Sequence, residues 1–322
     1  MTHDYQNKKI VCLGGGIGTV NLIKGLRKYT SNITIVVSMA DDGGSAGRLR
    51  RAYNVLPPGD VVSCLAALTK NEDFAKFLTY RFPGDRYGKD EELAGHKMGN
   101  LMMIAAEEVT GSFIGAIEYL KKIFGVDADI FPATEKAVTL HAITVDGREI
   151  STEEAIDLGK YDEPRILNKV HLLPEDLKTP PQVLTALDEA DYIIAGPGDL
   201  YSNLLPVLIT PDIAKKLTET KAEKIFILNV ANKPFETKGY VASDFIDAIE
   251  RHMHLFPFDT VVANNNYTEK IPSQFHYDYV KIDEKLKSNK LSFKLLENDL
   301  VNEDFPLYHN SEKLAEVIIK QI

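Results

Sequence analysis

The sequence predicts an α/β fold in which a Rossmann-like, mostly parallel sheet is flanked by helices and carries a small antiparallel insert. Short apolar runs rich in β-branched residues recur at 10–13, 33–39, 191–195, 224–230 and 259–263. Such continuous apolar runs are typical of parallel strands buried on both faces. Most of the stretches between them have helical periodicity, which favours βαβ units. We expect one domain over residues 1–322.

Composition limits the classes of function. The chain has 322 residues, 44% of them hydrophobic, and a net charge of −10. A diffuse acidic surface disfavours nucleic acids and anionic membranes, which are bound through basic patches. Cys12 and Cys64 stand in apolar surroundings, so no disulfide framework is indicated. Residues 1–9 lack the apolar core of a signal peptide, and no apolar run is long enough to span a bilayer. We expect a cytoplasmic protein.

The first strand runs directly into a glycine turn. Residues 10–13 are followed by Gly-Gly-Gly-Ile-Gly-Thr at 14–19 and by a helical pattern that leads to the strand at 33–39. The turn resembles the dinucleotide fingerprint, but Thr19 stands at the third glycine position. The lone acidic residue expected at the end of the second strand is also absent. We therefore expect neither NAD nor flavin, and instead predict phosphate contacts from Gly15, Gly16, Gly18 and Thr19.

The second strand is followed by the most unusual stretch of the chain, Asp41 to Arg50. Ten residues hold two adjacent carboxylates, three glycines, a hydroxyl and two arginines. Glycines allow close approach to a ligand, arginines bind phosphate, and carboxylates hold a cation or ribose hydroxyls. The alternative is a surface turn whose aspartates and arginines pair with each other. The predicted ligand contacts here are Asp41, Asp42, Gly44, Ser45 and Arg48.

Two helix starts follow. Asp60 in Pro-Pro-Gly-Asp is placed to cap a helix, to bind a metal, or to do both. Gly95 to Asn100 forms another glycine loop before an apolar helix, and helix N-termini favour anions. Asn100 is a candidate ligand contact. His96 is a candidate general base or phosphate donor, although a lone histidine is more often structural.

The period of the sequence changes between about 129 and 174. Asp146-Gly147 separates two alternating runs, which is a strong hairpin signal, and 166–173 alternates like a further strand. We expect an antiparallel insert here. The parallel pattern then resumes, and its strands end in Gly196-Pro197-Gly198, Asn229 and Asn264. A parallel topology brings all these strand ends to one edge of the sheet, so Gly196, Gly198 and Asn229 are also predicted ligand contacts.

Five motifs occur in the order of a known family. They are the glycine turn at 14–18, the block at 40–50, Pro-Pro-Gly-Asp at 57–60, Gly-His-x-x-Gly-Asn-Leu at 95–101 and Gly-Pro-Gly at 196–198. With them the chain resembles the gluconeogenesis factors of the YvcK type, which are related to the CofD-like 2-phospho-L-lactate transferases. The resemblance implies a Rossmann-like fold, binding of UDP-N-acetylglucosamine, and a role linking carbon metabolism to cell-wall precursor supply and cell shape.

The transferase branch of this resemblance implies transfer of a phospho-lactyl group from a nucleotide-activated donor to a deazaflavin, with a divalent metal. By position, Asp41 and Asp42 match the family's acidic pair, Asn100 its helix-start asparagine, and Tyr240 a tyrosine after the Asn229 strand. The sequence departs from the family pattern at Ala46, Val62, Lys97 and Asp199.

Three hypotheses follow. In the first, a regulator binds a nucleotide sugar, with Tyr240 packing on the base or sugar or else belonging to the core. In the second, a transferase uses Mg²⁺ held by Asp42 and Asp60, with Asp42 and His96 as catalytic groups. In the third, a scaffold binds protein partners through the 129–174 insert. The sequence is also compatible with a homo-oligomer.

Overall fold

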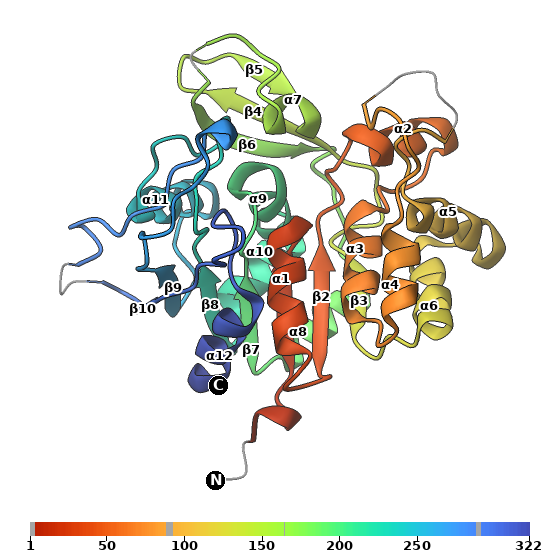
Figure 1. Ribbon diagram of the computed structural model, residues 1–322, viewed down its shortest axis with the longest axis horizontal. Coiled ribbons are helices and arrows are strands. Elements are labelled where there is room, and N and C mark those ends of the chain that lie inside the picture. The colour runs from red at the N-terminus through yellow and green to blue at the C-terminus, as the bar shows by residue number, and fades with distance from the viewer. Residues whose placement is uncertain (1–3, 88–92, 164, 288–290) are drawn as a thin grey trace.

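Seven parallel strands form the central sheet of the protein. The computed structural model describes residues 4–87, 93–163, 165–287 and 291–322 (Figure 1). The strand order is β10-β9-β8-β7-β1-β2-β3, and every neighbouring pair is parallel. The strands are β1 (Ile10–Gly14), β2 (Ile33–Val37), β3 (Asp129–Pro132), β7 (Tyr192–Ala195), β8 (Glu223–Ile227), β9 (Thr260–Asn264) and β10 (Lys294–Asn298). The predicted Rossmann-like α/β class is confirmed.

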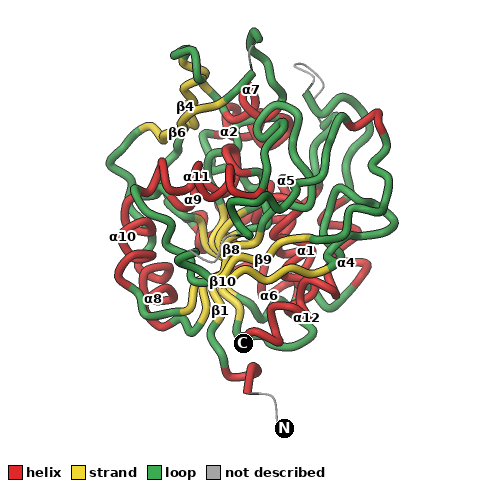
Figure 2. Tube along the Cα trace, turned by 90° about the vertical axis from the view of Figure 1, so that its left-hand side faces the viewer, coloured by secondary structure: helices red, strands yellow, loops and turns green. Residues whose placement is uncertain are grey.

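Helices cover both faces of this sheet, as the edge-on view shows (Figure 2). One face is covered by α1 (Gly16–Leu26), α3 (Gly59–Leu68), α4 (Glu72–Thr79) and α12 (Ser311–Gln321), with α5 (Met98–Thr110) and α6 (Phe113–Phe124) beyond them. The other face is covered by α8 (Pro181–Glu189), α9 (Leu205–Leu208), α10 (Pro211–Glu219) and α11 (Ala242–Met253). The five residues of β1 and of β9 are all buried, which accounts for their continuous apolar runs.

The strand order reverses between β1 and β7. From β1 the chain moves outward through β2 and β3, and it then returns to place β7 on the other side of β1. In open α/β sheets ligands bind at the carboxyl ends of the strands beside such a switch point. The strands that end in the two predicted glycine turns are therefore direct neighbours.

The antiparallel insert forms a separate three-stranded sheet, β5-β4-β6, built from β4 (Thr139–Thr144), β5 (Glu149–Ser151) and β6 (Leu167–Leu173). The predicted hairpin at Asp146-Gly147 joins β4 to β5. The insert is shorter than predicted, because Asp129–Pro132 pairs with β2 and forms the edge of the main sheet. The insert and α7 (Glu153–Asp157) lie above the carboxyl edge of the main sheet, and both termini lie at its opposite end (Figure 1).

Two local expectations differ from the structure. The sequence indicates no helix directly after β2, but this stretch becomes the helix α2 (Gly44–Tyr53) after only a short turn. Asp60 lies in the first turn of α3 and does not cap it, since Pro58 occupies the cap position. Among the described residues, none of the helices has the length and apolar character that crossing a membrane requires.

Candidate functional site

The glycine turns that follow β1 and β7 pack directly against each other. Gly196 N donates a hydrogen bond to Leu13 O at 3.0 Å. A methyl group on Gly18 would lie 2.3 Å from Pro197 O, so only glycine allows this approach. Gly198 N in turn donates to Asn229 Oδ1 at 3.1 Å. Three segments far apart in the sequence therefore meet at the switch point, as their strand ends predicted.

Asp60 and Asn203 lie behind the first glycine turn. A methyl group on Gly15 would be 2.2 Å from Asp60 Oδ2 and 2.7 Å from Asn203 Oδ1. The Asp60 carboxylate also accepts the Gly16 N–H. The α1 N-terminus, which could bind an anion, thus already has a carboxylate at one of its donors.

Asp41 and Asp60 are neighbouring carboxyl groups, since the charge of Asp60 acts on Asp41. Burial and the charge of Asp60 raise the pKa of Asp41 to about 7, although the Gly43 N–H donates to its Oδ1 at 3.0 Å. Burial also raises the pKa of Asp60. Two neighbouring carboxyls, one of which raises the pKa of the other, can share a proton, bind a cation, or accept hydrogen bonds from ligand hydroxyls.

Asp42 points in a different direction from Asp41. Its Oδ1 accepts from Glu154 N, at the start of α7, at 3.1 Å. Glu154 Oε2 in return accepts from Gly44 N, at the start of α2, at 3.0 Å. The predicted acidic pair is therefore divided between two tasks: Asp41 lies beside Asp60, and Asp42 joins the insert to α2. Within these contacts Asp41, and not Asp42, is the partner of Asp60.

Three basic side chains gather beside the carboxyl pair, and we call Arg81, Arg86 and Lys97 the cation cluster. Lys97 Nζ donates to Ser63 Oγ at 3.1 Å, and burial together with Arg81 lowers the pKa of Lys97. Arg81 donates to Gly95 O at 2.6 Å and to Ser45 Oγ at 3.3 Å. Within the described ranges these three cations form no ion pair with a carboxylate within 4.0 Å.

His96 and Asn100 lie at the start of α5, next to Lys97. His96 is 4% exposed and Asn100 is 1% exposed. Neither His96 Nδ1 nor Asn100 Oδ1 has a hydrogen-bond partner among the residues described. Burial, followed by Arg48 and Arg81, lowers the pKa of His96, which keeps its imidazole neutral. Buried polar atoms without partners are uncommon and require an explanation.

Several predicted ligand residues have structural partners. Thr19 is 1% exposed, and its hydroxyl lies under the Gly14 turn. Tyr240 shares a 2.8 Å hydrogen bond with the buried Tyr201 hydroxyl and packs edge-on against Phe245. Arg48 donates to Ala94 O. These side chains shape the site from behind, and their direct contact with a ligand stays a prediction.

A second charged group lies on the β8 side of the turns, and we call it the Lys233 network. Lys233 Nζ lies 2.8 Å from Asp199 Oδ2 and 3.3 Å from Glu236 Oε1, and it also pairs with Asp157 of α7. Burial alone would lower the pKa of Lys233, but the three carboxylates outweigh it and raise that pKa. Glu236 accepts in addition from Tyr201 N and from the backbone and hydroxyl of Ser202.

Sequence reasoning did not find several residues of this region. They are Arg81, Arg86, Asn203, Asp157, Lys233 and Glu236. None of them belongs to a motif, and most reach the site from loops or from the insert. Lys97 and Asp199 had been noticed only as departures from a family pattern. The structure shows that Asp199 is neutralised by Lys233 and that Lys97 lies beside Asp60.

The fold and the switch point define a Rossmann-like α/β protein. The chain belongs to the CofD family, since residues 10–301 match the model of 2-phospho-L-lactate transferase CofD. It is 34% identical to the gluconeogenesis factor of Bacillus subtilis (strain 168), with 98% of each chain covered. It is 33% identical to the gluconeogenesis factor of Halalkalibacterium halodurans, covering 98% of this chain and 97% of the relative.

A solved structure agrees with this assignment. A crystal structure of a protein from Bacillus halodurans superposes with a TM-score of 0.88 at 32% sequence identity, covering 97% of this chain and 99% of that one. The predicted relation to gluconeogenesis factors and to the CofD-like family is therefore confirmed.

Proposed function

We propose that the chain is a gluconeogenesis factor that binds a nucleotide sugar, UDP-N-acetylglucosamine, and regulates the link between carbon metabolism, cell-wall precursor supply and cell shape. The observation that carries the proposal is the contact between the β1 and β7 glycine turns at the switch point. This is where an open parallel sheet binds its ligands, and glycines keep the backbone accessible there.

The charges around the turns support a ligand with both phosphates and hydroxyls. The cation cluster offers positive charge that no described carboxylate pairs with, which suits a diphosphate. Asp41 and Asp60 would repel a phosphate placed directly on them. They can instead accept hydrogen bonds from the hydroxyls of a ribose or a sugar. A nucleotide sugar carries both kinds of group. Lys97 also supplies a cation beside α3, where Val62 stands in place of the family's arginine.

The family likeness supports the regulatory role. Relatives with the name gluconeogenesis factor match the chain along almost its full length. Moreover, the only histidine predicted as a base, His96, is buried and beside arginines, which disfavours the protonated form that a base must reach after taking up a proton. A ligand-binding role needs no such proton transfer.

The test is binding without turnover. UDP-N-acetylglucosamine should raise the melting temperature of the protein and give saturable heat in calorimetry, with the ligand recovered unchanged. UDP and N-acetylglucosamine 1-phosphate, tested separately, should bind more weakly. No thermal shift at millimolar ligand would contradict the proposal.

The carboxyl pair favours a second candidate, a metal-dependent transferase of the CofD type. Mg²⁺ prefers carboxylate oxygens together with phosphates of a substrate, and Asp41 with Asp60 offers such a donor set beside the glycine turns. Asp42 would then act through α7 and not as a ligand. Conversion of a nucleotide-activated donor that depends on Mg²⁺ would favour this candidate over the regulator.

A further inference from the structure

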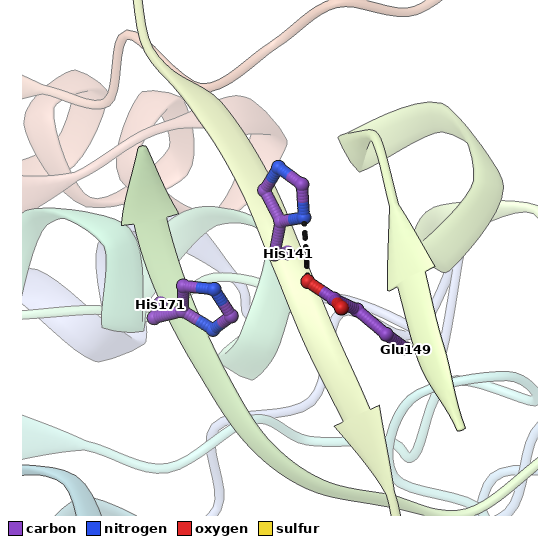
Figure 3. Close-up of side chains that lie close together, drawn as sticks. All are labelled: His141, Glu149 and His171. Atoms are coloured by element: carbon purple, nitrogen blue, oxygen red, sulfur yellow. Dashed lines mark hydrogen bonds and ion pairs between the residues drawn. The ribbon is translucent and has the colours of Figure 1, made fainter. Parts of the chain in front are cut away.

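The antiparallel insert carries a group of metal-binding side chains that is separate from the candidate site. His141 of β4 lies directly opposite His171 of β6 and Ser151 of β5 in the strand register. Glu149 lies two residues before Ser151, and side chains two residues apart on a strand share a face. Figure 3 shows His141, Glu149 and His171 on three neighbouring strands of the sheet. We call these three residues the insert triad.

The geometry of the insert triad is close to that of a metal site. One ligand atom from each residue lies within 4.8 Å of the other two. His141 Nδ1 and Glu149 Oε1 are 3.2 Å apart (Figure 3). Two ligands at about 2.0–2.2 Å from one tetrahedral zinc ion are separated by roughly 3.4 Å, so this pair already has the required spacing. The His171 ring is stacked on His141 at 5.3 Å between centroids.

We propose that the insert triad binds a divalent transition-metal ion, with Zn²⁺ as the best match. Two imidazoles and one carboxylate form a donor set that zinc uses readily, whereas Mg²⁺ and Ca²⁺ prefer oxygen ligands. The side chain of Glu149 is 61% exposed, so an ion can enter from solvent and water can complete its coordination.

Ser151 Oγ also lies 3.1 Å from His141 Nδ1, so this hydroxyl must give up that nitrogen when an ion binds. The other nearby groups do not compete for this role. His252 packs against β6, but its Nε2 accepts from Val170 N and its Nδ1 donates to Ala248 O, so both of its ring nitrogens are engaged. The carboxylates of the Lys233 network also lie close enough together to hold an ion, but Lys233 already occupies the centre of that group. Within the described part of the chain, no lysine or arginine forms an ion pair with Glu149 of the insert triad.

The metal would cross-link all three strands of the insert. The β4–β6 and β4–β5 pairings would gain a common anchor, and β5 leads directly into α7. Glu154 of α7 contacts Gly44 at the start of α2. An ion bound to the insert would therefore also restrict the motion of α7 against the candidate site. The proposal itself does not depend on what that site binds.

The experiment measures binding of Zn²⁺ alone to the full chain, by competition with a chromogenic chelator. The wild type should bind one zinc ion per chain tightly. His171→Gln and Glu149→Gln should each lower the affinity about tenfold or more, since each removes one ligand. Because Glu149 is exposed, its substitution leaves the fold intact. His276→Asn is the matched control, since it removes an exposed imidazole elsewhere and should bind like the wild type.

Two further readouts make the result decisive. X-ray absorption of the zinc-loaded protein should show two imidazole nitrogens at about 2.0–2.1 Å. Zinc should raise the melting temperature of the wild type and of His276→Asn, but not that of His171→Gln. Absence of a tightly bound zinc ion in the wild type, or unchanged affinity in both triad variants, would overturn the proposal and leave an ordinary stacked histidine pair with a surface ion pair.

Discussion

Two charged groups flank the same glycine turns, and they differ in how their charges are compensated. In the Lys233 network, one ammonium group meets three carboxylates, and the buried Glu236 accepts three further hydrogen bonds. In the cation cluster, hydrogen bonds go to neutral groups such as Ser63 and Gly95. Every charged side chain of the first group has an ion-pair partner within the group. Among the described residues, the cations of the second group have no carboxylate within 4.0 Å, so they can still pair with an anionic ligand.

This difference separates structure from function in a region where both use the same residue types. A buried charge that has lost its partner destabilises a protein, so folding favours complete networks. A binding site must instead keep uncompensated groups for its ligand, at a cost in stability. The contrast therefore predicts opposite effects for the same substitution at Lys233 and at Lys97.

The largest effect is expected at Lys233. Lys233→Met removes the cation that Asp157, Asp199 and Glu236 share, and it should lower the free energy of unfolding by about 3–5 kcal/mol. Urea denaturation measures this change. Lys285→Met, which breaks an exposed pair with Asp247, is the control and should change stability little. A loss below about 1 kcal/mol at Lys233 would mean that the network is not a structural unit.

The contact between the glycine turns gives the next largest effect. A methyl group on Gly18 would collide with backbone atoms of Pro197, so Gly18→Ala should destabilise the protein by about 1–3 kcal/mol. In Gly198→Ala the added methyl lies 3.6 Å from Gly15 O and 4.0 Å from Asn203 Cβ, which are ordinary contact distances, so this variant should fold normally. If the turns hold a diphosphate, Gly198→Ala should still weaken ligand binding. Equal melting temperatures for the two variants would contradict the close approach.

The sequence predicted much of this region, and the failures have physical causes. Buried strands such as β2 and β8 contain continuous apolar runs, and few other elements of secondary structure have this pattern. Helix α2 was missed because its glycines lower helix propensity, and here tertiary contacts such as Glu154 with Gly44 hold the helix start. Asp129–Pro132 was assigned to the insert because a four-residue strand is too short to show whether it pairs in parallel.

The site was predicted only as far as its motifs extend. Glycine turns can be recognised because close approach requires that residue type. The cation cluster and the Lys233 network depend on where separate loops meet, and nothing in the local sequence of Arg86 or Lys233 indicates that. The division of labour between Asp41 and Asp42 is likewise invisible in the sequence, because adjacent side chains at a turn can face different neighbours.

The matched substitution in the cation cluster should act on binding and not on stability. Lys97→Met removes a charge whose pKa is lowered by burial and by Arg81, so stability should be unchanged or slightly higher. The affinity for UDP-N-acetylglucosamine should fall about 10- to 100-fold, or roughly 1.4–2.7 kcal/mol, in calorimetry. A stability loss like that of Lys233→Met would remove the distinction between the two groups.

The smallest effect is a pH dependence that belongs to Asp41. Its pKa rises from 3.8 to about 7 on folding, mainly through burial and then through Asp60. The folded state therefore holds a proton that the unfolded state releases, so this group contributes stability below about pH 4 that is lost as the pH rises through 7. Asp41→Asn has no such loss. Between pH 5 and pH 8 the wild type should therefore lose about 1–2 kcal/mol of stability relative to Asp41→Asn. The difference in melting temperature between the two proteins measures this loss.

Magnesium sharpens the same experiment. An ion bound by Asp41 and Asp60 would cancel their repulsion, so at pH 8 it should stabilise the wild type and leave Asp41→Asn unchanged. That result would support the transferase candidate, because metal binding would then depend on the carboxyl pair. If magnesium has the same effect on both proteins while the pH dependence differs as expected, the pair titrates without holding a metal. The carboxyls would then be left to accept ligand hydroxyls, as the regulator requires.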